Sequence, residues 1–139
     1  MLLRGHRYLE TSSRLVSPEN VPKLLKRRGR NVILITRDPT PPREGVSVLW
    51  LSTIDHPRAV DPRKLHVIEQ KVWESLRSGN ADVILDGLEY LILENGPEPA
   101  LRFVGKLRDM AVLTNSNFYV VASDALEERI RSLLKRIVE

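Results

Sequence analysis

The chain has 139 residues, of which 42% are hydrophobic and 29% charged, a balance typical of one soluble globular domain covering residues 1–139. It contains no cysteine and no apolar run of the roughly 20 residues that cross a bilayer, which excludes disulfides, thiolate metal sites and a membrane span. Because 18 acidic residues offset 22 basic ones, the net charge is only +4, and we expect a cytoplasmic protein.

In the first half of the chain, short apolar runs alternate with polar, proline-rich stretches. Ser17 before Pro18 is a typical helix start, and Gly29 is a typical helix end. The predicted elements, in order, are a strand at 7–10, a loop at 11–17, a helix at 18–28, strands at 31–36 and 46–51, and an irregular stretch at 53–60.

The second half alternates more regularly between amphipathic helices and apolar strands. Asp61 with Pro62, and Asp124 with Glu127, are typical of helix starts. The predicted elements are a helix between 61 and 78, a strand at 81–86, a helix at 98–113, a strand at 118–122 and a helix from 124 onward. This alternation predicts a three-layer α/β fold, with a mainly parallel sheet of about five strands and helices on both faces.

The segment 81–92 organises the rest of the prediction. Its apolar run suits a strand buried on both faces, which stops at Asp86 and Gly87. Two interpretations of Asp86 are open: a carboxylate that holds a magnesium-bound water, as in P-loop nucleotidases, or a group that braces the turn. The apolar run from Tyr90 to Leu93 is likewise either part of the core or an exposed surface for self-association.

Polar side chains follow several of the predicted strands, and ligands of α/β sheets bind beyond the carboxyl ends of strands. If Arg37 faces Asp86 or Glu89, it forms either an anion clamp beside metal-binding or basic carboxylates, or an ion pair that joins two loops. The residues expected on this rim are Glu10, Thr36, Arg37, Ser52, Asp86, Glu89 and Ser123.

The sequence offers little support for catalysis. No stretch matches Gly-x-x-x-x-Gly-Lys-Ser/Thr, the loop that wraps backbone N–H groups around phosphates, and no Gly-x-Ser-x-Gly elbow is present. The histidines show no metal-ligand spacing, and the few aromatics do not interleave with basic residues as an RNA-stacking surface requires. We therefore expect a protein that is not an enzyme and that binds no metal or cofactor.

Basic residues gather near the ends of two predicted helices. They either complement helix dipoles in solvent or form a nucleic-acid site, and the second interpretation requires that the two clusters make one patch. The first cluster is Lys23, Lys26, Arg27, Arg28 and Arg30, and the second is Arg129, Arg131, Lys135 and Arg136.

Several fragments together resemble an archaeal family known as domain of unknown function 835. The most specific fragment is Leu85-Asp86-Gly87-Leu88-Glu89-Tyr90-Leu91, and Pro97 departs from the phenylalanine that the family tends to carry after Asn-Gly. The other matching fragments are Tyr8-Leu9-Glu10, Ile35-Thr36-Arg37-Asp38-Pro39, Trp50-Leu51-Ser52, Asp61-Pro62 and Asn95-Gly96, with Phe103 and Asp109.

The resemblance implies a RecA-like or KaiC-like domain that has lost the Walker A phosphate loop, and it supplies no catalytic residues. It further implies a regulatory or signalling module that acts through its surfaces and binds a protein partner or a second copy of itself. The rim near Asp86 is a candidate site for this binding. The alternative is a nucleic-acid-binding protein that uses the basic helix ends.

Overall fold

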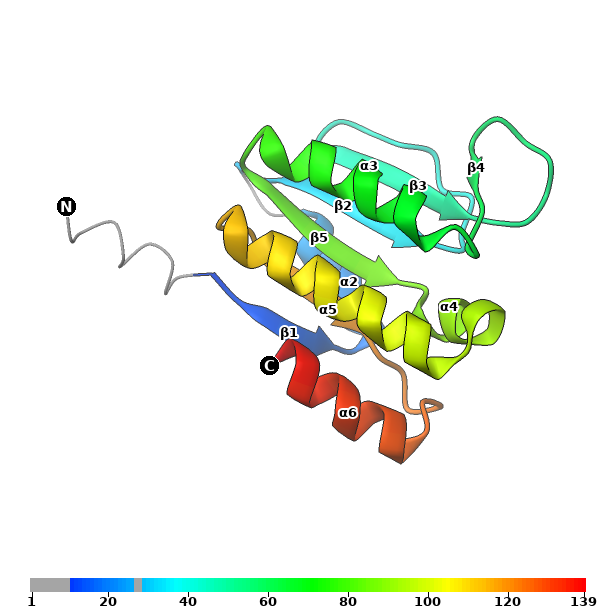
Figure 1. Ribbon diagram of the computed structural model, residues 1–139. Coiled ribbons are helices and arrows are strands. Elements are labelled where there is room, and N and C mark those ends of the chain that lie inside the picture. Colours follow the sequence, from blue (N-terminus) through cyan, green and yellow to red (C-terminus); the bar gives the residue numbers. More distant parts are fainter. Residues whose placement is uncertain (1–10, 27–28) are drawn as a thin grey trace.

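The computed structural model describes residues 11–26 and 29–139. Within them, six parallel strands form one sheet (Figure 1). The strands are β1 (Ser13–Val16), β2 (Asn31–Thr36), β3 (Val46–Leu51), β4 (Ala59–Val60), β5 (Ala81–Asp86) and β6 (Phe118–Val121). The helices are the 3₁₀ turn η1 (Pro18–Asn20), α2 (Val21–Leu25), α3 (Leu65–Arg77), α4 (Leu88–Asn95), α5 (Pro97–Leu113) and α6 (Glu128–Val138). Both the α/β class and the parallel sheet that the sequence predicted are confirmed.

The strand order is β1-β6-β5-β2-β3-β4, which places β5 inside the sheet between β6 and β2. Val83 and Leu85 are 0% exposed and Ile84 is 1% exposed, because both faces of this strand are covered. The interior position predicted for β5 from its continuous apolar run is thereby confirmed.

The two faces of the sheet are covered unequally. Alternate strand residues such as Ile35, Leu85 and Val120 point into the larger apolar core, which α3, α4, α5 and α6 close. Their neighbours, such as Leu34 and Ile84, belong to a smaller core that contains Leu24 of α2. Figure 1 accordingly shows α3, α5 and α6 in front of the sheet and α2 behind it.

The amino-terminal part of the described chain differs from the prediction. The strand expected at 7–10, with Glu10, lies outside the described residues, and the expected loop contains β1 instead. Strand β1 pairs in parallel with β6, with Leu15 opposite Val120 and Val16 opposite Val121. It is an edge strand with only two apolar residues, so it has almost none of the hydrophobic pattern that identifies interior strands.

Three helices begin at other residues than the sequence predicted. The helix expected at 18–28 is the turn η1 followed by the short α2, since Pro22 has no N–H to donate. Asp61 does not cap α3: its Oδ1 accepts a hydrogen bond from the Arg63 N–H at 2.9 Å, and the helix begins at Leu65. Similarly, α6 begins at Glu128 and not beside Asp124. In both places an Asp-containing turn precedes the helix.

Two smaller differences concern the surface elements. The stretch expected to be irregular contains β4, whose residues Ala59 and Val60 pair with the end of β3. The apolar run after β5 is the helix α4, which lies at the carboxyl edge of the sheet (Figure 1). Within the described residues, no helix is long and apolar enough to cross a membrane.

Candidate functional site at the carboxyl edge of the sheet

The carboxyl ends of β2 and β5 lie side by side, because their register pairs Thr36 with Asp86. From there the chain continues towards opposite lateral edges of the sheet: β2 leads to its neighbour β3 on one flank, whereas β5 leads through α4 and α5 to its neighbour β6 on the other. Such a divergence is where open α/β sheets bind ligands. The hollow at this point, here called the rim crevice, has a volume of about 380 Å³ and is lined by Thr36, Arg37, Asp38, Asp86, Gly87, Glu89, Tyr90 and Leu93.

The rim crevice unites some of the residues that the sequence placed on this rim. Arg37, Asp86 and Glu89 all line it. Ser52 instead supports the turn after β3, since its Oγ accepts a hydrogen bond from the Ile54 N–H at 3.2 Å. Glu10, also expected on this rim, lies outside the described residues.

Arg37 does not form the ion pair expected from the sequence. Its guanidinium lies over the ring of Tyr90, with Cζ 4.0 Å from the ring centroid. Among the described residues, no carboxylate oxygen comes within 4.0 Å of the Arg37 side-chain nitrogens. The arginine therefore interacts with an aromatic face, a contact of about 0.5–2 kcal/mol depending on how far solvent is excluded.

Asp86 is the most perturbed group of the rim crevice. Burial at the end of β5, with the negative charges of Asp38 and Glu89 nearby, raises its pKa from 3.8 to about 6. Neither a hydrogen bond nor an ion pair to the Asp86 carboxylate is formed within the described part of the chain. A carboxyl group without such a partner is easily neutralised, and Asp86 exchanges its proton near pH 6.

The backbone around Asp86 is held by close packing. Gly87 follows it, and a Cβ atom at Gly87 would come 3.1 Å from Cδ1 of Leu51, which is 1% exposed. Glu89, in the first turn of α4, accepts a hydrogen bond from the hydroxyl of Ser123 at 3.3 Å. This contact ties α4 to the chain that leaves β6.

The side chains of the rim crevice can support little chemistry beyond proton exchange. Asp86 can accept or donate a proton near neutral pH, but the groups beside it are two further carboxylates and a stacked arginine. In residues 11–26 and 29–139, no group of three or more His, Cys, Asp or Glu side chains is arranged to hold a metal ion. The rim crevice is thus a polar surface with an apolar part, made by Tyr90 and Leu93, and it is suited to recognition.

The described members of the two basic clusters do not form one patch. Lys23 and Lys26 flank Leu24 of α2, which packs on the smaller core, whereas α6 packs Leu134 on the larger core across the sheet. Arg27 and Arg28 lie outside the described residues.

Two members of the clusters are also engaged within the fold. Arg30 is paired with the buried Asp82, its Nη2 lying 2.5 Å from Oδ1, and Arg131 donates a hydrogen bond to the Ser123 carbonyl. The condition that the sequence set for a nucleic-acid site, a single continuous patch, is not met by the described residues.

Sequence reasoning did not include four lining residues of the rim crevice among the residues expected on this rim, namely Asp38, Gly87, Tyr90 and Leu93. Asp38 and Tyr90 stand in the fragments that carried the family resemblance, so a signal existed for both. Leu93 belongs to the apolar run from Tyr90 that the sequence left open as core or self-association surface, but such a run does not reveal which of its residues faces away from the core. In α4, Leu88 and Leu91 are 0% exposed, while Leu93 is 76% exposed.

Comparison with known proteins identifies a family. A family model with the description "Protein of unknown function (DUF835)" covers residues 13–138, which is nearly the whole described chain. A search of curated proteins finds no match. The family predicted from the fragments around Asp86 is thereby confirmed: the chain belongs to the DUF835 family of proteins of unknown function.

Proposed function

We propose that the domain is a non-catalytic regulatory and protein-interaction module, and that two copies associate through the carboxyl edge of the sheet around Leu93. The observation that carries this proposal is the exposure of Leu93, 76%, beside the stacked Arg37 and Tyr90. Isolated exposed leucines are common on soluble proteins. Leu93 differs because it borders a concave surface of aromatic and charged groups.

The composition of the rim crevice matches the anatomy of protein interfaces. Leu93 and Tyr90 provide apolar surface, while Asp38 and Glu89 provide charged groups on the same crevice. Tyrosine and arginine are the residue types that most often dominate binding energy, and Tyr90 and Arg37 are held together before any partner arrives. Little side-chain freedom would be lost on binding, which favours association.

The non-catalytic part of the proposal is supported by the chain after β1, where a strand–loop–helix would carry a phosphate loop. That segment reads Ser17-Pro18-Glu19-Asn20-Val21-Pro22. Pro18 and Pro22 have no N–H to offer a phosphate, and Glu19 would repel one. An α/β domain without phosphate-binding chemistry in this loop is left to act through its surfaces.

A matched pair of variants tests the proposed surface. Leu93→Asp places a charge in the centre of the rim crevice and should abolish association, whereas Leu113→Asp should leave it intact. Leu113 is a fair control because it is 75% exposed and ends α5 at the amino edge of the sheet. Sedimentation equilibrium measures both. Equal weakening by both variants, or by neither, would contradict the assignment of this surface.

A further inference from the structure

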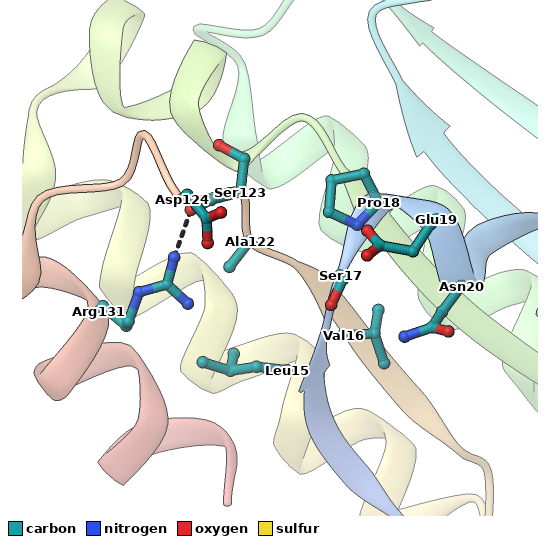
Figure 2. Close-up of a pocket in the computed structure, with 10 residues that line it drawn as sticks. All are labelled: Leu15, Val16, Ser17, Pro18, Glu19, Asn20, Ala122, Ser123, Asp124 and Arg131. Atoms are coloured by element: carbon teal, nitrogen blue, oxygen red, sulfur yellow. Dashed lines mark hydrogen bonds between the residues drawn. The ribbon is translucent and has the colours of Figure 1, made fainter.

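A second hollow opens at the carboxyl edge, between the ends of β1 and β6, and has a volume of about 410 Å³ (Figure 2). It shares no lining residue with the rim crevice. Its apolar floor is formed by Leu15, Val16 and Ala122, and its walls come from η1, from the chain after β6 and from α6. The volume lies in the range of small-molecule sites, which begins at about 300 Å³.

One wall carries a positive charge that the fold holds in place. Arg131 reaches from α6, and its Nη2 donates a hydrogen bond to the Ser123 carbonyl. Figure 2 shows the guanidinium beside the hollow at the end of this bond. A guanidinium has five N–H donors, and the Ser123 carbonyl is the acceptor that the described residues provide. The remaining donors are available to a ligand that carries a carboxylate.

Of the two negative charges that line the hollow, Glu19 lies opposite Arg131, whereas Asp124 lies on the same side as Arg131 in Figure 2. Glu19, on η1, lies on the opposite side of the hollow in Figure 2, and Asp124 follows the end of β6. Within the described residues, neither carboxylate has an oxygen within 4.0 Å of a basic side-chain nitrogen. Glu19 and Arg131 therefore place opposite charges on two facing walls of one small space.

Neutral polar groups complete the lining. Ser17 precedes η1 with the extended backbone of a capping residue, yet its side chain makes no capping hydrogen bond. Asn20 ends η1, and its side chain likewise caps nothing at the start of α2. Both side chains lie around the hollow in Figure 2, where they can bond to a ligand.

The charge pattern selects a class of ligand. A phosphate or another polyanion would be repelled by Glu19 and Asp124, and a simple cation would be repelled by Arg131. A small molecule that bears both a carboxylate and an ammonium group satisfies both walls. From this arrangement we infer that the hollow binds a free amino acid, with its carboxylate on Arg131, its ammonium group towards Glu19, and an aliphatic side chain on the floor of Leu15, Val16 and Ala122.

An NMR titration of the full chain tests this site with three probes of matched shape. L-Valine carries both charges, isovalerate lacks the ammonium group, and isobutylamine lacks the carboxylate. L-Valine should shift the backbone amides of Ser17, Asn20 and Ser123 in a saturable way. Each single-charge probe should bind at least about tenfold more weakly, a loss equal to one charged contact of roughly 1.4 kcal/mol. Equal binding of valine and isovalerate would mean an anion site only and would overturn the inference, as would the absence of saturable shifts with valine.

Single substitutions test whether Arg131 and Glu19 bind the two charged groups of the amino acid. Arg131→Gln and Glu19→Gln should each weaken valine binding by about tenfold or more. Lys135→Gln, an exposed position in the last turn of α6, should leave it unchanged. Glu19 is exposed, and no hydrogen bond or ion pair joins its side chain to another of the described residues, so its variant remains informative if Arg131→Gln unfolds. Unaltered binding in Glu19→Gln would refute the proposed orientation and the zwitterion site with it.

Discussion

The guanidinium of Arg37 stacks on the ring of Tyr90, with Cζ 4.0 Å from the ring centroid, and this contact determines the character of the rim crevice. It turns the arginine away from an ion pair with the carboxylate that ends β5. Asp86 is consequently left without an opposite charge, and its burial, together with the nearby charges of Asp38 and Glu89, raises its pKa to about 6. A surface with a preformed aromatic–cation pair and a readily neutralised carboxyl is suited to pH-dependent recognition.

The raised pKa of Asp86 predicts how stability depends on pH. Between the ordinary value of 3.8 and the folded value of about 6, the folded state binds more protons than the unfolded state. The Asp86 contribution to the free energy of unfolding therefore falls as the pH rises through that window. Asp86→Asn should raise the melting temperature above pH 7 and leave it nearly unchanged below pH 4. Thermal unfolding at several pH values measures this, with the exposed Asp55→Asn as control. If Asp86→Asn raises the melting temperature by the same amount at every pH, the raised pKa does not belong to Asp86.

Removal of the buried leucine at the centre of the sheet should be costly. Leu85 is 0% exposed, so Leu85→Ala leaves a cavity as well as losing apolar burial, and we expect a loss of about 2–5 kcal/mol in the free energy of unfolding. Leu113→Ala, at a position 75% exposed, should change it by less than about 0.5 kcal/mol. Urea denaturation measures both. Similar losses in the two variants would be inconsistent with β5 as an interior strand.

The ion pair between Arg30 and Asp82 should also contribute strongly to the free energy of unfolding. Asp82 is 1% exposed, and its Oδ1 also accepts a hydrogen bond from the Asn117 N–H at 3.0 Å. Arg30→Ala removes the cation from this buried carboxylate and should cost about 3 kcal/mol in urea denaturation. The control is Arg63→Ala, because the pair of Arg63 with Asp61 is solvent-exposed and its removal should have a much smaller effect. If both variants behave alike, the pair at Asp82 is not the anchor that its burial indicates.

Nucleotide binding provides a fourth prediction. Because Pro18 and Pro22 supply no N–H donors in the loop after β1, and Glu19 adds a negative charge there, no preorganised phosphate cradle exists. Isothermal titration with magnesium-ATP should give no saturable heat, and no ATP hydrolysis should be measurable. A dissociation constant in the micromolar range would refute this prediction and reopen the question of enzymatic activity.

The sequence predicted the interior of the fold better than its edges. β2 and β5 contain continuous apolar runs, and their burial follows directly from that composition. β1 escaped prediction because an edge strand that pairs on one side needs few apolar residues, and its strand conformation comes from pairing with β6, which is distant in the chain. The starts of α3 and α6 were misplaced because Asp61 and Ser123 support turns that resemble helix caps in sequence.

The site was predicted in part. The rule on strand ends brought Arg37, Asp86 and Glu89 to one crevice, because parallel strands end at a common edge. It could not reveal that Arg37 contacts Tyr90, since this depends on how α4 is oriented. The separation of the basic clusters was likewise hidden, because the face on which a helix packs is set by the crossover connections between strands.

Light scattering of the unmodified chain is the most direct test of the proposed association. Below pH 6 Asp86 is increasingly neutral, which reduces the repulsion between two copies that each present Asp38, Asp86 and Glu89 beside a single Arg37. A twofold contact there should bury about 1,200–2,000 Å². At micromolar concentration and a pH below 6, we predict a mass of twice 15.9 kDa, which declines towards one chain as the pH rises. A mass of 15.9 kDa at every concentration and pH would contradict the proposal that the domain acts by pairing through this edge.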